Sequence, residues 1–231
     1  MIPWLDHRHV FPPLTQALKE PNGLLVAGGD LSPQRILAAY RQGIFPWFMP
    51  GEPILWWSPS PRMVLYVDEF KVPKSLVKVV RHRRYQITFD TAFEQVMQGC
   101  AAPRGTEAGT WISDEMLAAY TALHEAGFAH SFECWMDGEL VGGLYGMALG
   151  KMFYGESMFA RRSDASKIAF VHAVQWLRAN GFAMIDCQMY TDHLARFGAR
   201  EIDRDEFVAK LKVLLDEPEQ LGPWQYCHIN E

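Results

Sequence analysis

The sequence predicts a mixed α/β protein of the α+β type, with a small turn-rich N-terminal domain, residues 1–61, and a larger domain, residues 62–231. Prolines and glycines cluster in the first part, whereas longer periodic elements fill the second. In the second part, strands joined by tight turns come before a helix, a strand and a helix. This order favours a central, mainly antiparallel sheet over a doubly wound sheet or a barrel.

The N-terminal part contains one segment with a clear helical pattern, from Ser32 to Gln42. Ser32 is a suitable N-cap, Pro33 fits the first helical position, and Gly43 ends the pattern. The other periodic runs in this part are short and interrupted by Pro and Gly. We therefore expect this domain to depend on the rest of the chain for its stability.

The larger part begins with elements in which strand and helix patterns alternate. They are a strand at Met63–Val67, a basic helix at Pro73–His82, a strand at Tyr85–Phe89 and helices at Thr91–Gln98 and Ser113–Glu125. A β-meander follows at His130–Met136, Leu140–Leu149 and Met152–Phe159, then a helix at Asp164–Arg178, a strand at Ala183–Met189 and a helix at Asp203–Leu215. Alternation at every second residue indicates the strands, and spacing of three or four indicates the helices.

The composition excludes several classes of protein. With 231 residues, 49% of them hydrophobic, the chain can bury one large core or a main core with a small satellite. A formal net charge of −5 and 13% aromatic residues exclude an intrinsically disordered chain. No run approaches the roughly 18 apolar residues of a membrane helix, and the N-terminus lacks a signal-peptide pattern. We expect a cytoplasmic protein that does not bind membranes.

The cysteines and histidines do not have the spacing of a metal or redox site. His7 and His9 have no third potential ligand beside them, so we expect no metal. The cysteines, which we expect to be reduced thiols, lie far apart at Cys100, Cys134, Cys187 and Cys227.

A local excess of positive charge lies between residues 71 and 84. The segment has no Asp or Glu, and its cations are Lys71, Lys74, Lys78, Arg81, Arg83 and Arg84. A solvated helix face is the ordinary explanation of such a run. Because no acid is interleaved, we favour contact with an RNA backbone.

Two polar positions stand out in the strand expected at residues 183–189. Alternation places Asp186 and Gln188 on one face, about 7 Å apart. A buried carboxylate needs partners, so Asp186 is equally well explained as a structural residue or as part of a functional site. Glu156, in an otherwise apolar strand beside Met158, could bind a cation at the mouth of an apolar pocket. A salt bridge across the sheet is the alternative, which the pattern alone slightly favours.

Glycines and tryptophans give weaker signals. Gly142, Gly143 and Gly146 lie inside an expected strand, which favours close backbone approach or a bulge over a dinucleotide-binding loop. Loop tryptophans can stack on a nucleic-acid base or fill a domain junction. They are Trp47, Trp56, Trp57 and Trp111, of which we expect Trp56 and Trp57 to be structural.

Several long blocks of sequence match one family in order, from about residue 11 to residue 202. They are Glu20-Pro21-Asn22-Gly23-Leu24-Leu25, Gly28-Gly29-Asp30-Leu31-Ser32-Pro33, Gly43-Ile44-Phe45-Pro46-Trp47-Phe48, Pro53-Ile54-Leu55-Trp56-Trp57-Ser58-Pro59, Gly109-Thr110-Trp111-Ile112, Leu140-Val141-Gly142-Gly143, Gly155-Glu156-Ser157-Met158-Phe159 and Ile185-Asp186-Cys187-Gln188. The chain thereby resembles the leucyl/phenylalanyl-tRNA–protein transferases, bacterial enzymes of the N-end rule pathway.

This resemblance implies a larger domain similar to GNAT-type acetyltransferases. It also implies transfer of leucine or phenylalanine, and to a lesser extent methionine, from aminoacyl-tRNA, with Leu-tRNA and Phe-tRNA as the partners. The acceptor is the α-amino group of a protein that begins with Arg or Lys, and the new peptide bond creates an N-degron. By the same resemblance we expect a monomer that uses no cofactor and no coenzyme A.

The resemblance also implies roles for individual residues. Gln188 and Asp186 are the expected catalytic residues, with Gln188 accepting a hydrogen bond from the attacking amine and Asp186 supporting the proton transfer. Glu156 is expected to bind the cationic acceptor residue. Residues expected around the terminal adenosine and the amino-acid side chain are Trp47, Trp111, Tyr120, Phe153, Met158 and Phe170. The basic segment 71–84 corresponds to the tRNA-binding patch of the family.

Two other hypotheses remain open on the sequence. A coenzyme-dependent N-acyltransferase of the same fold is disfavoured, because the turn before residue 164 lacks the Q/R-x-x-G-x-G/A pattern that holds a pyrophosphate. A non-catalytic RNA-binding module would make Asp186 and Gln188 dispensable.

Overall fold

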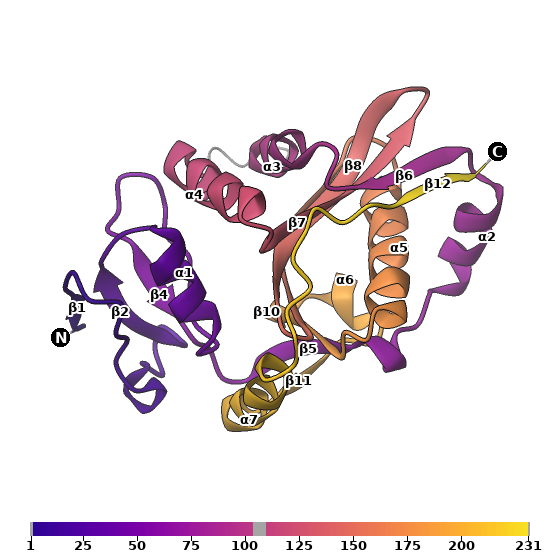
Figure 1. The fold of residues 1–231 in the computed structure, drawn as a ribbon. Helices are drawn as coiled ribbons and strands as arrows, with labels where there is room; N and C mark the ends of the chain where they lie inside the picture. The colour runs from indigo at the N-terminus through magenta and orange to yellow at the C-terminus, as the bar shows by residue number, and fades with distance from the viewer. Residues whose placement is uncertain (1, 104–109, 231) are drawn as a thin grey trace.

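The computed structural model describes residues 2–103 and 110–230, whose strands form two sheets (Figure 1). The smaller sheet, of order β1-β2-β4-β3, belongs to the first part of the chain. It consists of β1 Trp4–Leu5, β2 Leu24–Gly28, β3 Phe45–Pro46 and β4 Leu55–Trp57, accompanied by α1 Pro33–Tyr40. The sequence predicted only the helix here, because such short strands carry too little alternation to be recognised.

The larger sheet confirms the predicted mixed fold with a mainly antiparallel centre. Its order is β11-β5-β10-β9-β8-β7-β6-β12, and among these pairs only β9 and β10 run parallel in the described chain. The strands are β5 Arg62–Tyr66, β6 Tyr85–Phe89, β7 Ala129–Met136, β8 Glu139–Leu149, β9 Met152–Ala160, β10 Met184–Gln188, β11 Arg200–Ile202 and β12 Cys227–Asn230. The short β11 and β12 were not predicted, since each depends on a distant partner strand.

Helices cover both faces of this sheet (Figure 1). They are α2 Lys74–His82, α3 Phe93–Ala101, α4 Asp114–Glu125, α5 Ala165–Ala179, α6 Asp192–Ala195 and α7 Arg204–Leu215, and there are 3₁₀ turns at Leu14–Gln16 and Val67–Glu69. Apolar residues of α2 and α5 pack in one core, and those of α1, α3, α4 and α7 pack in the other. The helix predicted from Thr91 begins instead at Phe93, because the backbone of Ala92 is not helical, with φ −147° and ψ 44°, and its N–H donates to the Glu133 side chain.

The second of these cores joins the two parts of the chain. Ile36 and Trp56 from the first part belong to the same apolar cluster as Tyr120 and Phe207 from the second. Trp56 is fully buried and its indole N–H donates to the Gly28 carbonyl at 2.9 Å, as a structural tryptophan should. The domain boundary near residue 61 stays a prediction.

Beside the parallel strand pair, β8 carries the predicted glycines. Gly142, Gly143 and Gly146 lie within this strand, and the register shifts between Tyr145 and Gly146. A Cβ atom added at Gly146 would lie 2.1 Å from the Tyr154 carbonyl oxygen, so this approach requires glycine. The prediction of a bulge or close backbone approach is confirmed.

Candidate functional site

A cavity of about 450 Å³ lies beside the point where β9 and β10 stop pairing. The last paired residues are Tyr154 and Asp186, and the residues that follow on each strand line the cavity together with α5 and the start of α6. Predicted site residues in the lining are Trp111, Phe153, Glu156, Met158, Phe170, Asp186 and Gln188. The structure therefore brings together most of the side chains that the sequence singled out.

Asp186 forms a fully buried ion pair with Arg62 of β5. The guanidinium donates from Nε to Oδ1 at 2.8 Å and from Nη2 to Oδ2 at 2.6 Å, a bidentate arrangement. Arg62 also donates to the Gly43 carbonyl at 3.1 Å and lies over the rings of Phe45 and Phe207. The partner that the buried Asp186 carboxylate requires is thus an arginine.

Gln188 follows a bulge that the sequence did not predict. Asp186 pairs with Val64 and Gln188 with the next residue of β5, Met63, so the expected alternation ends after Asp186. Gln188 has a φ of 56°, and its backbone N–H donates to Asp186 Oδ1 at 3.0 Å. Its side-chain Nε2 is buried without a hydrogen-bond partner among the described residues. The Asp186 carboxylate therefore holds the backbone that presents the Gln188 amide to the cavity.

Glu156 lies on β9, across the cavity from Gln188 of β10, and tyrosine hydroxyls hold its carboxyl group. Tyr40 of α1 donates to Oε1 at 2.6 Å, and Tyr120 of α4 lies 3.4 Å from Oε2 and 2.5 Å from the Tyr40 hydroxyl. Burial raises the pKa of both hydroxyls well above the ordinary value, so they remain protonated donors. The salt bridge considered from the sequence does not form within the described residues, where Glu156 has hydrogen-bond donors and no ion-pair partner.

The Glu156 carboxyl is poised to ionise near neutral pH. Burial raises its pKa to about 7, and the Tyr40 hydrogen bond opposes that shift. A carboxyl with a perturbed pKa at the wall of a cavity is a recognised mark of a functional site. It could bind a cation that replaces the missing charge partner.

The remaining predicted substrate-binding residues fall into two groups. Phe153, Met158 and Phe170 form apolar parts of the cavity wall, and Trp111 lies at the same cavity. Tyr120 is buried behind Glu156, whereas Trp47 is 43% exposed and packs edge-on against Trp57. Trp47 is thus outside this cavity lining. Gly109, in the block that carries Trp111, lies outside the described residues.

The basic segment forms α2 and its flanks. Lys71, Lys74, Lys78, Arg81 and Arg84 are exposed, and Arg83 donates to the Ser163 carbonyl at the start of α5. The helical spacing predicted for this run is confirmed. The charges therefore project to solvent on the side of the molecule that α5 and α2 cover.

Sequence reasoning missed Tyr40 and Arg62. Arg62 directly precedes the apolar run Met63–Leu65, and a cation at that position needs a buried acid, so it could have been paired with Asp186. Tyr40 was interpreted only as part of the apolar helix face. No local signal links it to Glu156.

Metal-binding clusters and membrane-spanning helices are both absent from the part of the chain that the structure describes. Residues 2–103 and 110–230 contain no cluster of His, Cys, Asp and Glu able to hold a metal ion. In that same part of the chain, no helix is both long and apolar enough to cross a bilayer.

A mostly apolar cavity with a titratable carboxyl and an amide at its wall is typical of an enzyme site. The family model for the leucyl/phenylalanyl-tRNA protein transferase matches residues 64–212, and the model for its N-terminal domain matches residues 29–60. The chain belongs to this family and is an aminoacyltransferase.

Individual relatives agree with this assignment. A leucyl/phenylalanyl-tRNA–protein transferase of Chromobacterium violaceum is 61% identical over 231 residues, covering 100% of this chain and 99% of the relative. One of Nitrosospira multiformis is 61% identical over 228 residues, covering 99% and 98%. A GCN5-related N-acetyltransferase from Kribbella flavida matches in structure with a TM-score of 0.31 and 14% identity, over 71% of this chain and 59% of that one. A TM-score that low carries no argument here.

Proposed function

We propose that the protein transfers leucine or phenylalanine, and methionine less well, from aminoacyl-tRNA to the α-amino group of proteins that begin with Arg or Lys. The product would carry a new peptide bond and act as an N-degron. The observation that supports this most directly is the cavity in which the Gln188 amide and the Glu156 carboxyl meet an apolar wall, within the region matched by the family model. We further propose that it works as a cytoplasmic monomer without a cofactor.

The donor side chain would occupy the apolar wall of the cavity. Phe153 and Phe170 offer rigid rings, and Met158 can adapt its rotamers to either a branched or an aromatic guest. Because one methylene in such a pocket is worth only about 1–3 kcal/mol, some use of methionine follows. Trp111 would flank the terminal adenosine. Trp47, which is outside the cavity lining, would need to approach the adenosine from the first domain.

The chemistry requires little activation, because an aminoacyl ester is already reactive. The amine nitrogen attacks the ester carbonyl carbon, the new C–N bond forms, the bond to the ribose oxygen breaks, and the amine proton passes to that leaving oxygen. Gln188 would orient the amine through a hydrogen bond to its side-chain oxygen. Asp186 would act through Gln188, since its carboxylate is already engaged by Arg62 and by the Gln188 N–H.

Acceptor choice would depend on Glu156. An incoming Arg or Lys side chain would place a cation beside the carboxyl, which favours the ionised form and a charge-assisted hydrogen bond. Tyr40 and Tyr120 would keep the carboxyl in place as the cation arrives. A neutral N-terminal residue would leave this buried group uncompensated.

The tRNA body would contact the cations of α2. Their exposure and the absence of acids in segment 71–84 favour phosphate contacts. Such contacts position the substrate and carry no sequence information themselves.

The test is transfer of labelled leucine from Leu-tRNA to a peptide that begins with Arg, compared with a peptide that begins with Ala. We expect label in the first peptide only, and a roughly 100- to 10,000-fold loss of kcat in Gln188→Ala. Gln98→Ala, an exposed glutamine of α3, is the matched control. Full activity of a variant carrying both Asp186→Ala and Gln188→Ala would contradict the proposed roles.

A further inference from the structure

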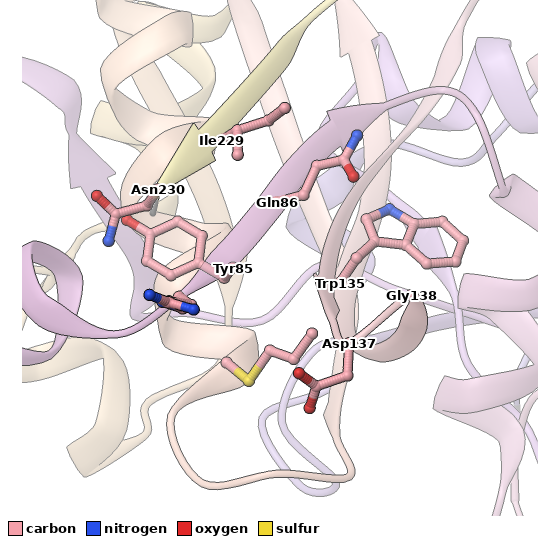
Figure 2. A pocket seen from close by; sticks show the side chains of 9 residues that line it. Tyr85, Gln86, Trp135, Asp137, Gly138, Ile229 and Asn230 are labelled. Carbon is pink, nitrogen blue, oxygen red and sulfur yellow. The ribbon is translucent and has the colours of Figure 1, made fainter.

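A second hollow, of about 370 Å³, lies toward the β12 edge of the large sheet (Figure 2). It shares no lining residue with the cavity described above. Its floor is a row of side chains from neighbouring strands: Trp135 of β7 pairs with Gln86 of β6, which pairs with Ile229 of β12. Register partners point to the same face of a sheet. An indole, an amide and a 62% exposed isoleucine therefore form one continuous surface, the Trp135 row.

The Trp135 ring is fixed in its orientation. Its Nε1–H donates to Thr88 Oγ1 at 2.8 Å, and one part of the side chain packs against the core while another lines the hollow. Figure 2 shows the ring and the Gln86 amide lying side by side. A ring held in this way loses little conformational entropy when a flat ligand stacks on it.

Positive charge borders the row. Arg84 lines the hollow, is exposed and has no ion-pair or hydrogen-bond partner among the described residues. A neighbouring hollow of about 300 Å³ is lined by Arg83, Arg84 and Arg162. The acid in the same lining, Asp137, is paired with Arg162 at 2.7 Å.

The row and the cavity lie toward the same end of the sheet. Ala160 at the end of β9 pairs with Gly142, and Gly142 pairs with Cys134, the neighbour of Trp135. From β9 to β6 there are three strand spacings, or roughly 15 Å. Met158 packs on the core that α5 covers and Trp135 on the core that α3 and α4 cover, so a polymer that reaches both must pass around this end of the sheet.

We propose that the Trp135 row is an additional RNA site, at which a nucleotide of the tRNA donor stacks its base on Trp135 and places a phosphate on Arg84. This inference rests on the proposed use of aminoacyl-tRNA. A fixed aromatic face beside an unpaired guanidinium is the combination by which proteins hold unpaired nucleotides. The row extends the RNA contact beyond the cations of α2 to the surface of the sheet.

The experiment compares Trp135→Leu with two donors, leucyl-tRNA and the minimal donor leucyl-adenosine, which lacks the rest of the RNA. We expect KM for leucyl-tRNA to rise about 5- to 100-fold, with kcat little changed and leucyl-adenosine used as by the wild type. Trp135→Phe, which retains a stacking ring, should recover most of the loss. Trp4→Leu, a 68% exposed tryptophan of the small sheet, is the control.

An unchanged KM for leucyl-tRNA in Trp135→Leu overturns the proposal, as does an equal loss with both donors, which would indicate a structural effect. A raised KM for the acceptor peptide alone also overturns it and would indicate a peptide site. Failure of the wild type to use leucyl-tRNA would count against the proposed function itself. In that event, retention of uncharged tRNA on a filter by wild type and Trp135→Leu still decides whether the row binds RNA.

Discussion

Replacing Arg62 by methionine should destabilise the protein more than the loss of any exposed ion pair would. The change leaves the fully buried Asp186 carboxylate without its bidentate partner and removes the contacts of the guanidinium with Phe45 and Phe207. Breaking a buried pair from one side costs about 3–5 kcal/mol. We expect a loss of that size in the free energy of unfolding of Arg62→Met, measured by urea denaturation with tryptophan fluorescence.

Two control variants test whether the lost stability comes from leaving the buried Asp186 charge unpaired. Arg178→Met removes a 2.8 Å pair with Asp68 whose side chains are 57% and 79% exposed, and it should cost about 1 kcal/mol or less. The double variant Arg62→Met with Asp186→Leu removes both charges and should regain most of the lost stability. If Asp186 acts by holding Gln188, this stable double variant will still be inactive. A loss in Arg62→Met no larger than that in Arg178→Met would refute the reasoning.

Three further outcomes are expected. The Glu156 carboxyl has a pKa of about 7 in the folded protein, above its ordinary 4.5, so the folded state binds this proton more tightly than the unfolded state. The resulting contribution to the free energy of unfolding is complete below pH 4.5 and is lost as the pH rises to 7. Urea titrations from pH 4.5 to 7 should thus show wild-type stability falling by roughly 2–3 kcal/mol relative to Glu156→Gln, and parallel curves would contradict the assignment. Changing Lys74 and Lys78 to Ala should weaken tRNA binding and reduce the slope of log K against log salt by roughly 1–2, and an unchanged slope would exclude these contacts. Gly146→Ala should cost about 1–3 kcal/mol, because its Cβ would meet a carbonyl at 2.1 Å, whereas Gly155→Ala, with 3.7 Å to its nearest neighbour, should unfold at nearly the wild-type urea concentration.

Local patterns were enough to predict the meander and every described helix except the short α6. The turn Asp137-Gly138 between β7 and β8 and the Ser113 cap of α4 act over a few residues, and both are present. The predictions failed for elements whose pairing partner lies far away in the sequence. Strand β12 exists because Cys227 pairs with Thr88, and the end of alternation at Gln188 depends on the register with Met63.

The sequence by itself determined the mixed fold, the charged run of α2 and the identity of the polar residues in the cavity wall, because periodicity, turn chemistry and charge counts are properties of short segments. Only the tertiary structure decided what those polar residues contact. Arg62 and Asp186 are 124 positions apart, and Tyr40 and Glu156 are 116 apart. Such pairs form because packing of the two cores closes long loops and removes these groups from water, where each must find whatever partner the folded chain places beside it.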